Sequence, residues 1–496
     1  MRVVPQLDTY PRLVALAQTP LGKVAAAVAF GFLLLLNGQP LALQVGAIVA
    51  ILSFLPEHRR AISSAATLGW LLFHPNWIPW ALIRKVAANE RLAAGFGLQL
   101  AVGAALGAVF CAMGALFRMV HDRPNSLLGR RAVLVLVSSY LCLLAMAGAL
   151  PLHGWARVAI WLAVAVISPY LWFFAYALTD SASRNPDSYP IQFGTFFPFW
   201  VGSTTSFTPI GKGAAFLRKV EVRTARELAL IQLRALKLLV WLFLLNIVLA
   251  IFRVLAYGEL SPLAADFCRV HGLHIPNLAA PTLETAINQT ASGVPMALHM
   301  RWAAVVAQFV DGLLAMSVSG NLVVACVRMS GFNILRNTYK PLYSATIAEF
   351  WNRFYYYFKE LLVEFFFFPA YIRYFKKHRR LRLAAATFAA ATLGNLIYHF
   401  CRDIQCVFDL GLWRALAGLQ VYAFYAVGLG TAIAISQMRG KRPPLGSLPF
   451  HRRLMASAGV IGFYCLLGVF NYEGRSHSLR THLAFFWSLV PIGTGW

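Results

Sequence analysis

The sequence predicts an all-α, polytopic integral membrane protein with about 10–12 transmembrane helices. Two observations carry this prediction. Hydrophobic residues make up 59% of the 496 residues and charged residues only 12%, and the mean hydropathy of +0.64 lies far outside the range of soluble domains. The remaining charges fall in short basic clusters between long apolar runs. Re-entrant or interfacial helices are expected around a central cavity, all within one membrane domain spanning residues 1–496.

Candidate spans follow one another along the chain. The apolar runs long enough to cross or nearly cross a bilayer are 22–37, 41–55, 92–117, 132–150, 155–178, 235–256, 302–327, 382–400, 411–437, 455–471 and 481–495. Two further apolar stretches, 67–83 and 192–217, are interrupted by Pro or Gly, and we expect re-entrant or interfacial segments there because irregular backbone at membrane depth must be covered by protein. The domain divides into N-terminal helices (1–190), a core (191–400) and C-terminal helices (401–496).

Basic residues outnumber acidic ones, 44 to 18, for a net charge of +26. In a soluble protein this balance would indicate nucleic acid, but basic clusters between apolar runs are typical of loops facing anionic lipid. We therefore expect a multi-pass protein of the cell (inner) membrane, with membrane lipid and not nucleic acid as its partner. The acid-rich stretch 254–300 is expected outside, and the N-terminal orientation stays open. The clusters expected in the cytoplasm are Arg218–Lys237, Arg328–Lys340, Arg373–Arg382 and Arg439–Arg453.

The stretch 349–365 combines a polar stripe with many aromatic side chains. At 100° per residue one narrow sector of a continuous helix collects Glu349, Arg353, Tyr356, Glu360 and Glu364. Large apolar side chains fill the opposite side. A helix of this kind lies at an interface or lines a cavity, and a plain amphipathic anchor is the alternative.

Ionisable or polar residues inside apolar helices are the next candidates. His399 stands near the end of the apolar run 382–400, with Asn395 one turn earlier, and Asp311 lies inside the run 302–327. Such groups are costly in a bilayer and are typical of internal cavities or pathways. A structural role is the alternative for each: His399 as a core histidine, Asp311 as a partner of a neighbouring helix.

A polar loop follows the fifth run, with the sequence "TDSASRNPDSYP". Its Asp180, Arg184 and Asp187 are typical of an ordinary loop in which Asp or Ser caps a helix. We predict no chemistry for it.

The order of residues over 331–400 resembles the membrane-bound O-acyltransferase family, most closely its branch of alginate O-acetylation and D-alanine export proteins. A weaker likeness extends back through 192–250. The residues that match the family's order are Gly331, Phe332, Asn337, Pro341, Thr346, Ile347, Phe350, Trp351, Arg353, Phe354 and His399.

The resemblance implies transfer of an acyl group from a cytoplasmic thioester, acyl-CoA or an acyl carrier protein, to a hydroxyl acceptor such as a cell-envelope glycan or lipid. It implies no bound cofactor and no metal, and it allows an extracytoplasmic or carrier-protein partner. His399 would be the general base, and Asn352 and Tyr355 are the other catalytic candidates. The basic block Arg373–Arg382 would attract an anionic carrier, or instead face lipid. Candidates for substrate binding are Trp351, Arg353, Tyr356, Glu360, Asn337, Asn395 and Asp311.

The sequence departs from this family at two places. The family has His or Asn where this chain has Tyr355, and "LIYHF" replaces its usual Trp-His-Gly turn. A tyrosine titrates near 10 and is a poor base. Tyr355 therefore leaves open a catalytically silent scaffold. The other alternative is a transporter or flippase for a lipid-linked or anionic substrate, in which Asp311, His399 and the polar face of 349–364 would line a pathway.

Overall fold

The computed structural model describes residues 4–73, 78–92, 95–192, 212–439, 449–471 and 477–490. Helices account for 79% of the structure, and the described residues include no β-strand. An isolated antiparallel bridge pairs Glu221 with Phe332. The prediction of an all-α protein is confirmed.

Within the described residues, seven helical stretches are long and apolar enough to cross a membrane, and an eighth is counted if the bent pair α1 (Pro11–Gln18) and α2 (Pro20–Leu36) forms one span. This architecture is that of a multi-pass membrane protein, but the number is below the predicted 10–12. Two predicted spans are too short, because α3 covers only Ala42–Phe54 and α25 only Leu479–Trp487. The seven stretches are Phe96–Asp122, Leu127–Ala149, Gly154–Ser181, Ala225–Tyr257, Leu298–Met329, Arg379–Arg402 and Gln420–Met438.

The chain folds into two compact units, each assembled from three separate segments. The first unit comprises Met1–Trp241, Gly320–Arg336 and Tyr398–Ala415, and the second comprises Leu242–Ser319, Asn337–Ile397 and Leu416–Trp496. Several helices begin in one unit and end in the other. They are α12 (Ala225–Tyr257), α15 (Leu298–Met329), α20 (Asn395–Arg402) and α22 (Leu412–Gly418).

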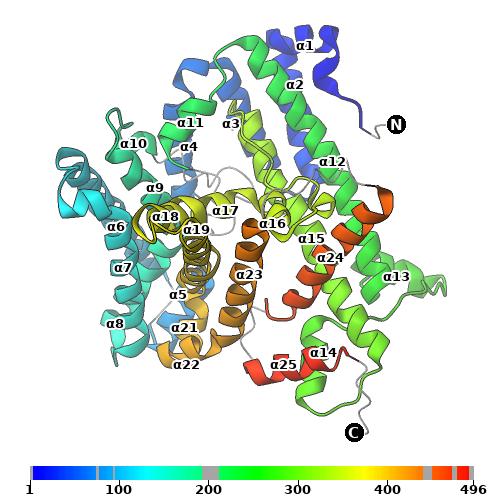
Figure 1. Cartoon of the computed structure of the whole chain (residues 1–496). Helices are drawn as coiled ribbons and strands as arrows, with labels where there is room; N and C mark the ends of the chain where they lie inside the picture. The colour runs from blue at the N-terminus through cyan, green and yellow to red at the C-terminus, as the bar shows by residue number, and fades with distance from the viewer. Residues whose placement is uncertain are drawn as a thin grey trace. The chain divides into compact units, whose positions relative to one another are not determined.

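The first unit is built around a buried helix. Helix α9 (Leu171–Ser181) is apolar around almost its whole circumference and is buried accordingly. Helices α6 and α7 contact it, and α8 lies beside both of them (Figure 1). The other helices wholly within this unit, besides α1 to α3, are α4 (Arg59–Phe73), α5 (Trp80–Asn89), α6 (Phe96–Asp122), α7 (Leu127–Ala149), α8 (Gly154–Ile167), α10 (Tyr189–Gln192), α11 (Ala214–Val220) and α21 (Ile404–Leu410).

A short backbone pairing joins distant segments of the first unit. The N–H of Val222 donates to the carbonyl of Gly331 (3.0 Å), and the N–H of Asn333 donates to that of Val220 (2.7 Å). Gly331 has a φ of +94°, which favours glycine. A Cβ there would also lie 2.8 Å from Nε of Arg59, so this position requires glycine for two reasons.

Arg59 lies beside the backbone pairing of Val222 with Gly331, and the residue is only 2% exposed. Its Nη1 donates to the carbonyl of Val222 (2.6 Å) and its Nε to that of Leu52 (3.3 Å). Burial lowers the pKa of its guanidinium, and the nearby Glu221 carboxylate opposes that shift. Arg59 thus links the end of α3 to the segment that precedes α12.

The second unit holds the core around Phe350, whose ring stacks on Tyr464 with centroids 4.0 Å apart. Helix α23 (Gln420–Met438) packs along α19 (Arg379–Phe388) and against α16 (Ile347–Phe354) (Figure 1). The remaining elements are α13 (Pro262–Val270), α14 (Leu283–Ala291), α17 (Tyr356–Leu362), the π-helix Val363–Phe367, α18 (Phe368–Arg373), the π-helix Ala389–Gly394, α24 (Phe450–Gly468) and α25.

Candidate functional site

The stretch 349–365 is not one continuous helix. Helix α16 ends at Phe354 and α17 begins at Tyr356, because Tyr355 has a non-helical backbone (φ −141°, ψ 73°). A π-helical turn, Val363–Phe367, then changes the rotation per residue again. The predicted single stripe over 349–365 is therefore wrong, although each half keeps its own polar face.

The loop 337–339 holds this break in place. It bonds the backbone groups that the interrupted helix leaves without partners. The four bonds are Tyr339 N–H to Arg353 O (2.8 Å), Thr338 Oγ1–H to Phe354 O (2.7 Å), Tyr356 N–H to Asn337 O (2.9 Å) and Tyr357 N–H to Asn337 Oδ1 (3.3 Å). Asn337, predicted to bind substrate, is fully buried and caps α17 here.

Replacing Asn337 with alanine is expected to destabilise the second unit by about 1–3 kcal/mol, because the N–H of the buried Tyr357 loses its acceptor. Thermal unfolding in detergent, followed by circular dichroism, measures the change. Asn333→Ala is the control, since the Asn333 side chain is exposed. Equal melting temperatures for the two variants would refute the capping role of Asn337.

The polar stripe becomes two local clusters. On α16, Nη2 of Arg353 lies 2.7 Å from Oε1 of Glu349. On α17, Lys359 pairs with Glu360, and its Nζ lies 4.7 Å from the centroid of the Tyr356 ring. Burial and the Glu360 carboxylate raise the pKa of the Tyr356 hydroxyl, which therefore stays neutral and able to donate a hydrogen bond.

A cavity of about 130 Å³ opens beside these clusters, within the second unit. Its apolar wall comprises Ala348, Trp351, Leu362, Val363, Phe367, Ala390, Ala391 and Ile433. Its polar residues are Asn352, Lys359, Thr387 and Gln437. The side chains of Asn352 and Gln437 are exposed and mark its mouth, whereas Thr387 is buried and donates to Oε1 of Gln437 (2.7 Å).

Both π-helical turns contribute to the cavity wall. Val363 and Phe367 come from the first turn, and Ala390 and Ala391 from the second, Ala389–Gly394. The two turns touch, since a Cβ at Gly394 would lie 2.6 Å from the Phe366 ring. A π-turn widens a helix locally and is frequent at functional sites.

Asn395 directly follows the second π-turn, one turn after Ala391. It is fully buried, and its Oδ1 accepts a hydrogen bond from the Tyr422 hydroxyl (3.0 Å). Its Nδ2 has no hydrogen-bond partner among the described residues. Rotating the amide by 180° would leave the oxygen unpartnered instead, so one end of this buried amide stays without a partner in either orientation.

His399 lies in the half of α20 that belongs to the first unit. The ring of Tyr398 stacks on Trp172 with centroids 5.8 Å apart. The carbonyl of Cys401 accepts from the Tyr140 hydroxyl (3.0 Å) and from Oγ of Ser168 (3.2 Å). These contacts fix the backbone on both sides of His399, whose own side chain is half-buried.

Asp311 forms a two-pronged ion pair within the second unit. Its Oδ1 lies 2.6 Å from Nε of Arg253, and its Oδ2 lies 3.1 Å from Nη2 of the same arginine. The pair joins α15 to α12, which is the structural alternative that the sequence left open. The partner was not identifiable from sequence because it lies 58 residues away.

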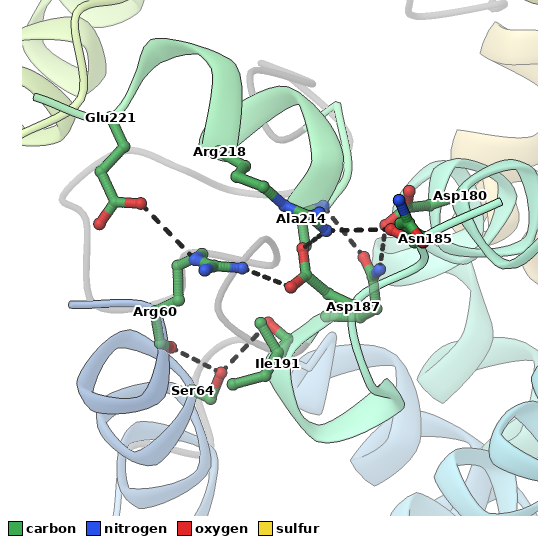
Figure 2. Close-up of polar contacts among 10 residues, drawn as sticks. Arg60, Ser64, Asp180, Asn185, Asp187, Ile191, Ala214, Arg218 and Glu221 are labelled. Carbon is green, nitrogen blue, oxygen red and sulfur yellow. Dashed lines mark hydrogen bonds and ion pairs between the residues drawn. The ribbon is translucent and has the colours of Figure 1, made fainter. Parts of the chain in front are cut away.

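The first unit contains a charged network that the sequence did not predict. Figure 2 shows Asp187 between two arginines: it pairs with Arg60 through one oxygen, and its other oxygen lies 2.5 Å from Nη2 of Arg218. Nε of Arg60 also lies 3.6 Å from Oε2 of Glu221. The interpretation of Asp187 as part of an ordinary capping loop is wrong, because α4 and α11 bring both arginines to it.

Asp180 is likewise part of this network and not of a simple cap. Nε2 of Gln192 donates to the Asp180 carboxylate, and Oε1 of Gln192 accepts from the N–H of Ala214 (3.1 Å). These bonds hold together the two ends of the predicted re-entrant stretch 192–217. Most of that stretch, 193–211, and the proline-containing part 74–77 of the stretch 67–83 lie outside the described residues.

The network predicts a pH dependence of stability. Burial is the main cause that raises the pKa of Glu221, and Asp187 adds to it, against the opposing effect of Arg60 and Arg59. The folded state therefore holds this proton more tightly than the unfolded chain, so stability falls as the pH rises from about 4.5 through the raised pKa. Glu221→Gln removes this contribution. Its melting temperature is expected to fall less between pH 4.5 and 7 than that of the unchanged protein; an equal or steeper fall would contradict the assignment.

The structure thus brings Trp351 and Asn352 to one cavity, together with Lys359, Thr387 and Gln437, which the sequence did not single out. Tyr355 occupies the helix break, its ring 5.5 Å from that of Phe358. The cavity lining does not include Arg353, Tyr356, Glu360, Asn337, Asn395, Asp311 or His399. The sequence matches no protein-family model and no curated protein.

Proposed function

We propose that the protein is a membrane-bound O-acyltransferase that moves an acyl group from a thioester, acyl-CoA or an acyl carrier protein, to a hydroxyl of a cell-envelope glycan or lipid at the inner membrane. One observation carries the proposal. The segment whose residue order resembles the acyltransferase family contributes Trp351 and Asn352 to an apolar cavity with a polar mouth.

The lining of the cavity suits an acyl group. Trp351, Leu362 and Phe367 offer an apolar surface, while Asn352 offers donors for a carbonyl oxygen. An apolar cavity of about 150 Å³ is enough to bind benzene, so about 130 Å³ is sufficient for a short acyl chain. Lys359 also lines the cavity, where its charge is paired with Glu360.

In the proposed reaction His399 removes the proton of the acceptor hydroxyl while the oxygen attacks the thioester carbonyl. The new C–O bond gives a tetrahedral oxyanion. Its collapse breaks the C–S bond and expels a thiolate, which takes up the proton from the His399 imidazolium. The products are an ester and a free thiol, and the imidazole is neutral again.

The oxyanion requires a positioned donor. Asn395 stands four residues before His399, so the two side chains leave α20 on the same side. The Asn395 amide accepts a hydrogen bond from Tyr422, and one end of the amide has no partner among the described residues. A buried donor without a protein partner is suited to bind a ligand atom. Asn352 and Tyr355 are the other candidate donors. Arg353, Tyr356 and Glu360 would shape the polar side of the site.

The block Arg373–Arg382 offers a basic surface to the anionic carrier of the acyl group. Arg382 is already engaged, since its guanidinium lies 3.9 Å from the centroid of the Tyr371 ring. The exposed cations before it are available for an anionic carrier or for lipid headgroups. They are Arg373, Lys376, Lys377, Arg379 and Arg380.

Membranes from cells that express the protein test the proposal, because they contain the natural acceptor. Acyl-labelled acetyl-CoA and a long-chain acyl-CoA are added in separate reactions, and the free thiol and the ester label in glycan and lipid fractions are measured. We expect the amount of free thiol released to match the amount of label found as ester. Neither product should form in membranes without the protein. Release of thiol without ester, or uptake of intact donor into vesicles, would overturn it in favour of hydrolysis or transport.

A further inference from the structure

A second hollow in the second unit is lined by other residues of α16 and α23, the helices that also contribute to the cavity beside Trp351. It is a groove of about 430 Å³ between the start of α16, the end of α23 and the first half of α24. This volume is in the range of ordinary ligand sites. The groove exists because small residues line all three elements: Ala345, Ala432, Ala456 and Gly459.

The groove has an apolar floor and one cationic end. Ile435, Met455 and Val460 line it, and Met455 is 73% exposed, as a side chain facing lipid would be. Arg439 and Ser436 supply the polar end. The N–H of Arg439 donates to the carbonyl of Ile435, but its side chain forms no ion pair or hydrogen bond with any described residue. None of the residues that line the groove is acidic.

The position of Arg439 relates the groove to the bilayer. Arg439 immediately follows the candidate span Gln420–Met438, so its charge stands at the level where lipid headgroups meet the apolar core. Glu349, the acid nearest in sequence to this edge of α16, is already neutralised by Arg353 and accepts from the N–H of Ala345. The net local charge is therefore positive.

We propose that this groove binds an anionic phospholipid, with its phosphate at Arg439 and Ser436 and one acyl chain along Ile435, Met455 and Gly459. The charge favours an anionic headgroup over a zwitterionic one, because no lining carboxylate is present to pair with an amine. The site does not depend on acyl transfer.

Native mass spectrometry of the delipidated, detergent-purified protein tests this site, with palmitoyl-oleoyl phosphatidylglycerol and phosphatidylcholine added in equal amounts. Phosphatidylglycerol is expected to bind preferentially. Arg439→Gln should weaken its binding by about fivefold, the effect of one basic residue at a membrane surface. Arg452→Gln is the matched control, since Arg452 is an exposed arginine of α24 outside the groove lining.

A second variant tests the chain-binding part. A Cβ at Gly459 would meet no atom within 4 Å, so Gly459→Leu fills the groove without disturbing the fold. It is expected to abolish retention of phosphatidylglycerol while leaving the circular dichroism spectrum unchanged. Equal binding of the two lipids, equal losses in Arg439→Gln and Arg452→Gln, or full binding in folded Gly459→Leu would each overturn the proposal.

Discussion

Replacing His399 with alanine is expected to lower acyl transfer by about 10²–10⁴-fold, the usual contribution of a general base. Without the imidazole, no group takes the hydroxyl proton as the oxygen attacks. Binding of the donor should change little, because His399 does not line the cavity beside Trp351 and Asn352. The loss is therefore expected in kcat and not in KM for the thioester.

The matched control is His451→Ala, since the His451 side chain is exposed on the first turn of α24. Ester formation is measured in the same membranes, after equal amounts of each variant are confirmed to elute as a single peak in size-exclusion chromatography. Asn395→Leu, which removes the buried amide, is expected to lower kcat as well. Unchanged transfer in folded His399→Ala would exclude it as the base, and an equal loss in His451→Ala would show that the effect is not specific.

The all-α class and the membrane placement were predictable because they follow from the hydrophobicity of single segments. A run of about 20 apolar residues satisfies its backbone internally and needs no distant partner. The number of spans was less predictable, since hydropathy does not say where a helix ends. Helix α3, for example, ends at Phe54 after 13 residues, just before Pro56.

The helix break at Tyr355 could not be predicted from helical periodicity. Its cause is tertiary: the loop at Asn337 and Thr338 offers partners for backbone groups that a continuous helix would have bonded internally. The same holds for the cavity, because Thr387 and Gln437 reach it from helices well apart in sequence. Periodicity describes one helix, whereas these features depend on which helices meet.

The charged network around Asp187 could not be predicted from the sequence for a related reason. The sequence places Asp187 in a polar loop, but its partner Arg60 lies 127 residues away. Local charge patterns identify caps and loops, and they carry no information on such distant pairs. In a membrane protein a polar loop with several charges is thus better treated as a candidate for long-range pairing.

Arg59→Ala is expected to be the most destabilising of the substitutions considered, at about 3–5 kcal/mol. Arg59 is 2% exposed, and removal of its guanidinium leaves the carbonyls of Leu52 and Val222 without this donor. It also removes a positive charge from the neighbourhood of Glu221, whose pKa is already raised by burial. The alanine would leave a cavity beside Gly331, where the backbone pairing of the first unit is formed.

Thermal unfolding in detergent should show a fall in the melting temperature of about 5–10 °C for Arg59→Ala. Arg59→Lys keeps the charge but offers a single ammonium in place of the two donors that reach different carbonyls, so an intermediate fall is expected. Arg130→Ala, at an exposed arginine of α7, is the control and should melt as the unchanged protein does. If Arg59→Lys were as stable as the unchanged protein, charge alone would account for the role of Arg59. If Arg59→Ala were equally stable, the guanidinium would not hold the pairing of Val222 with Gly331, and that pairing would have to be stabilised by its own backbone bonds.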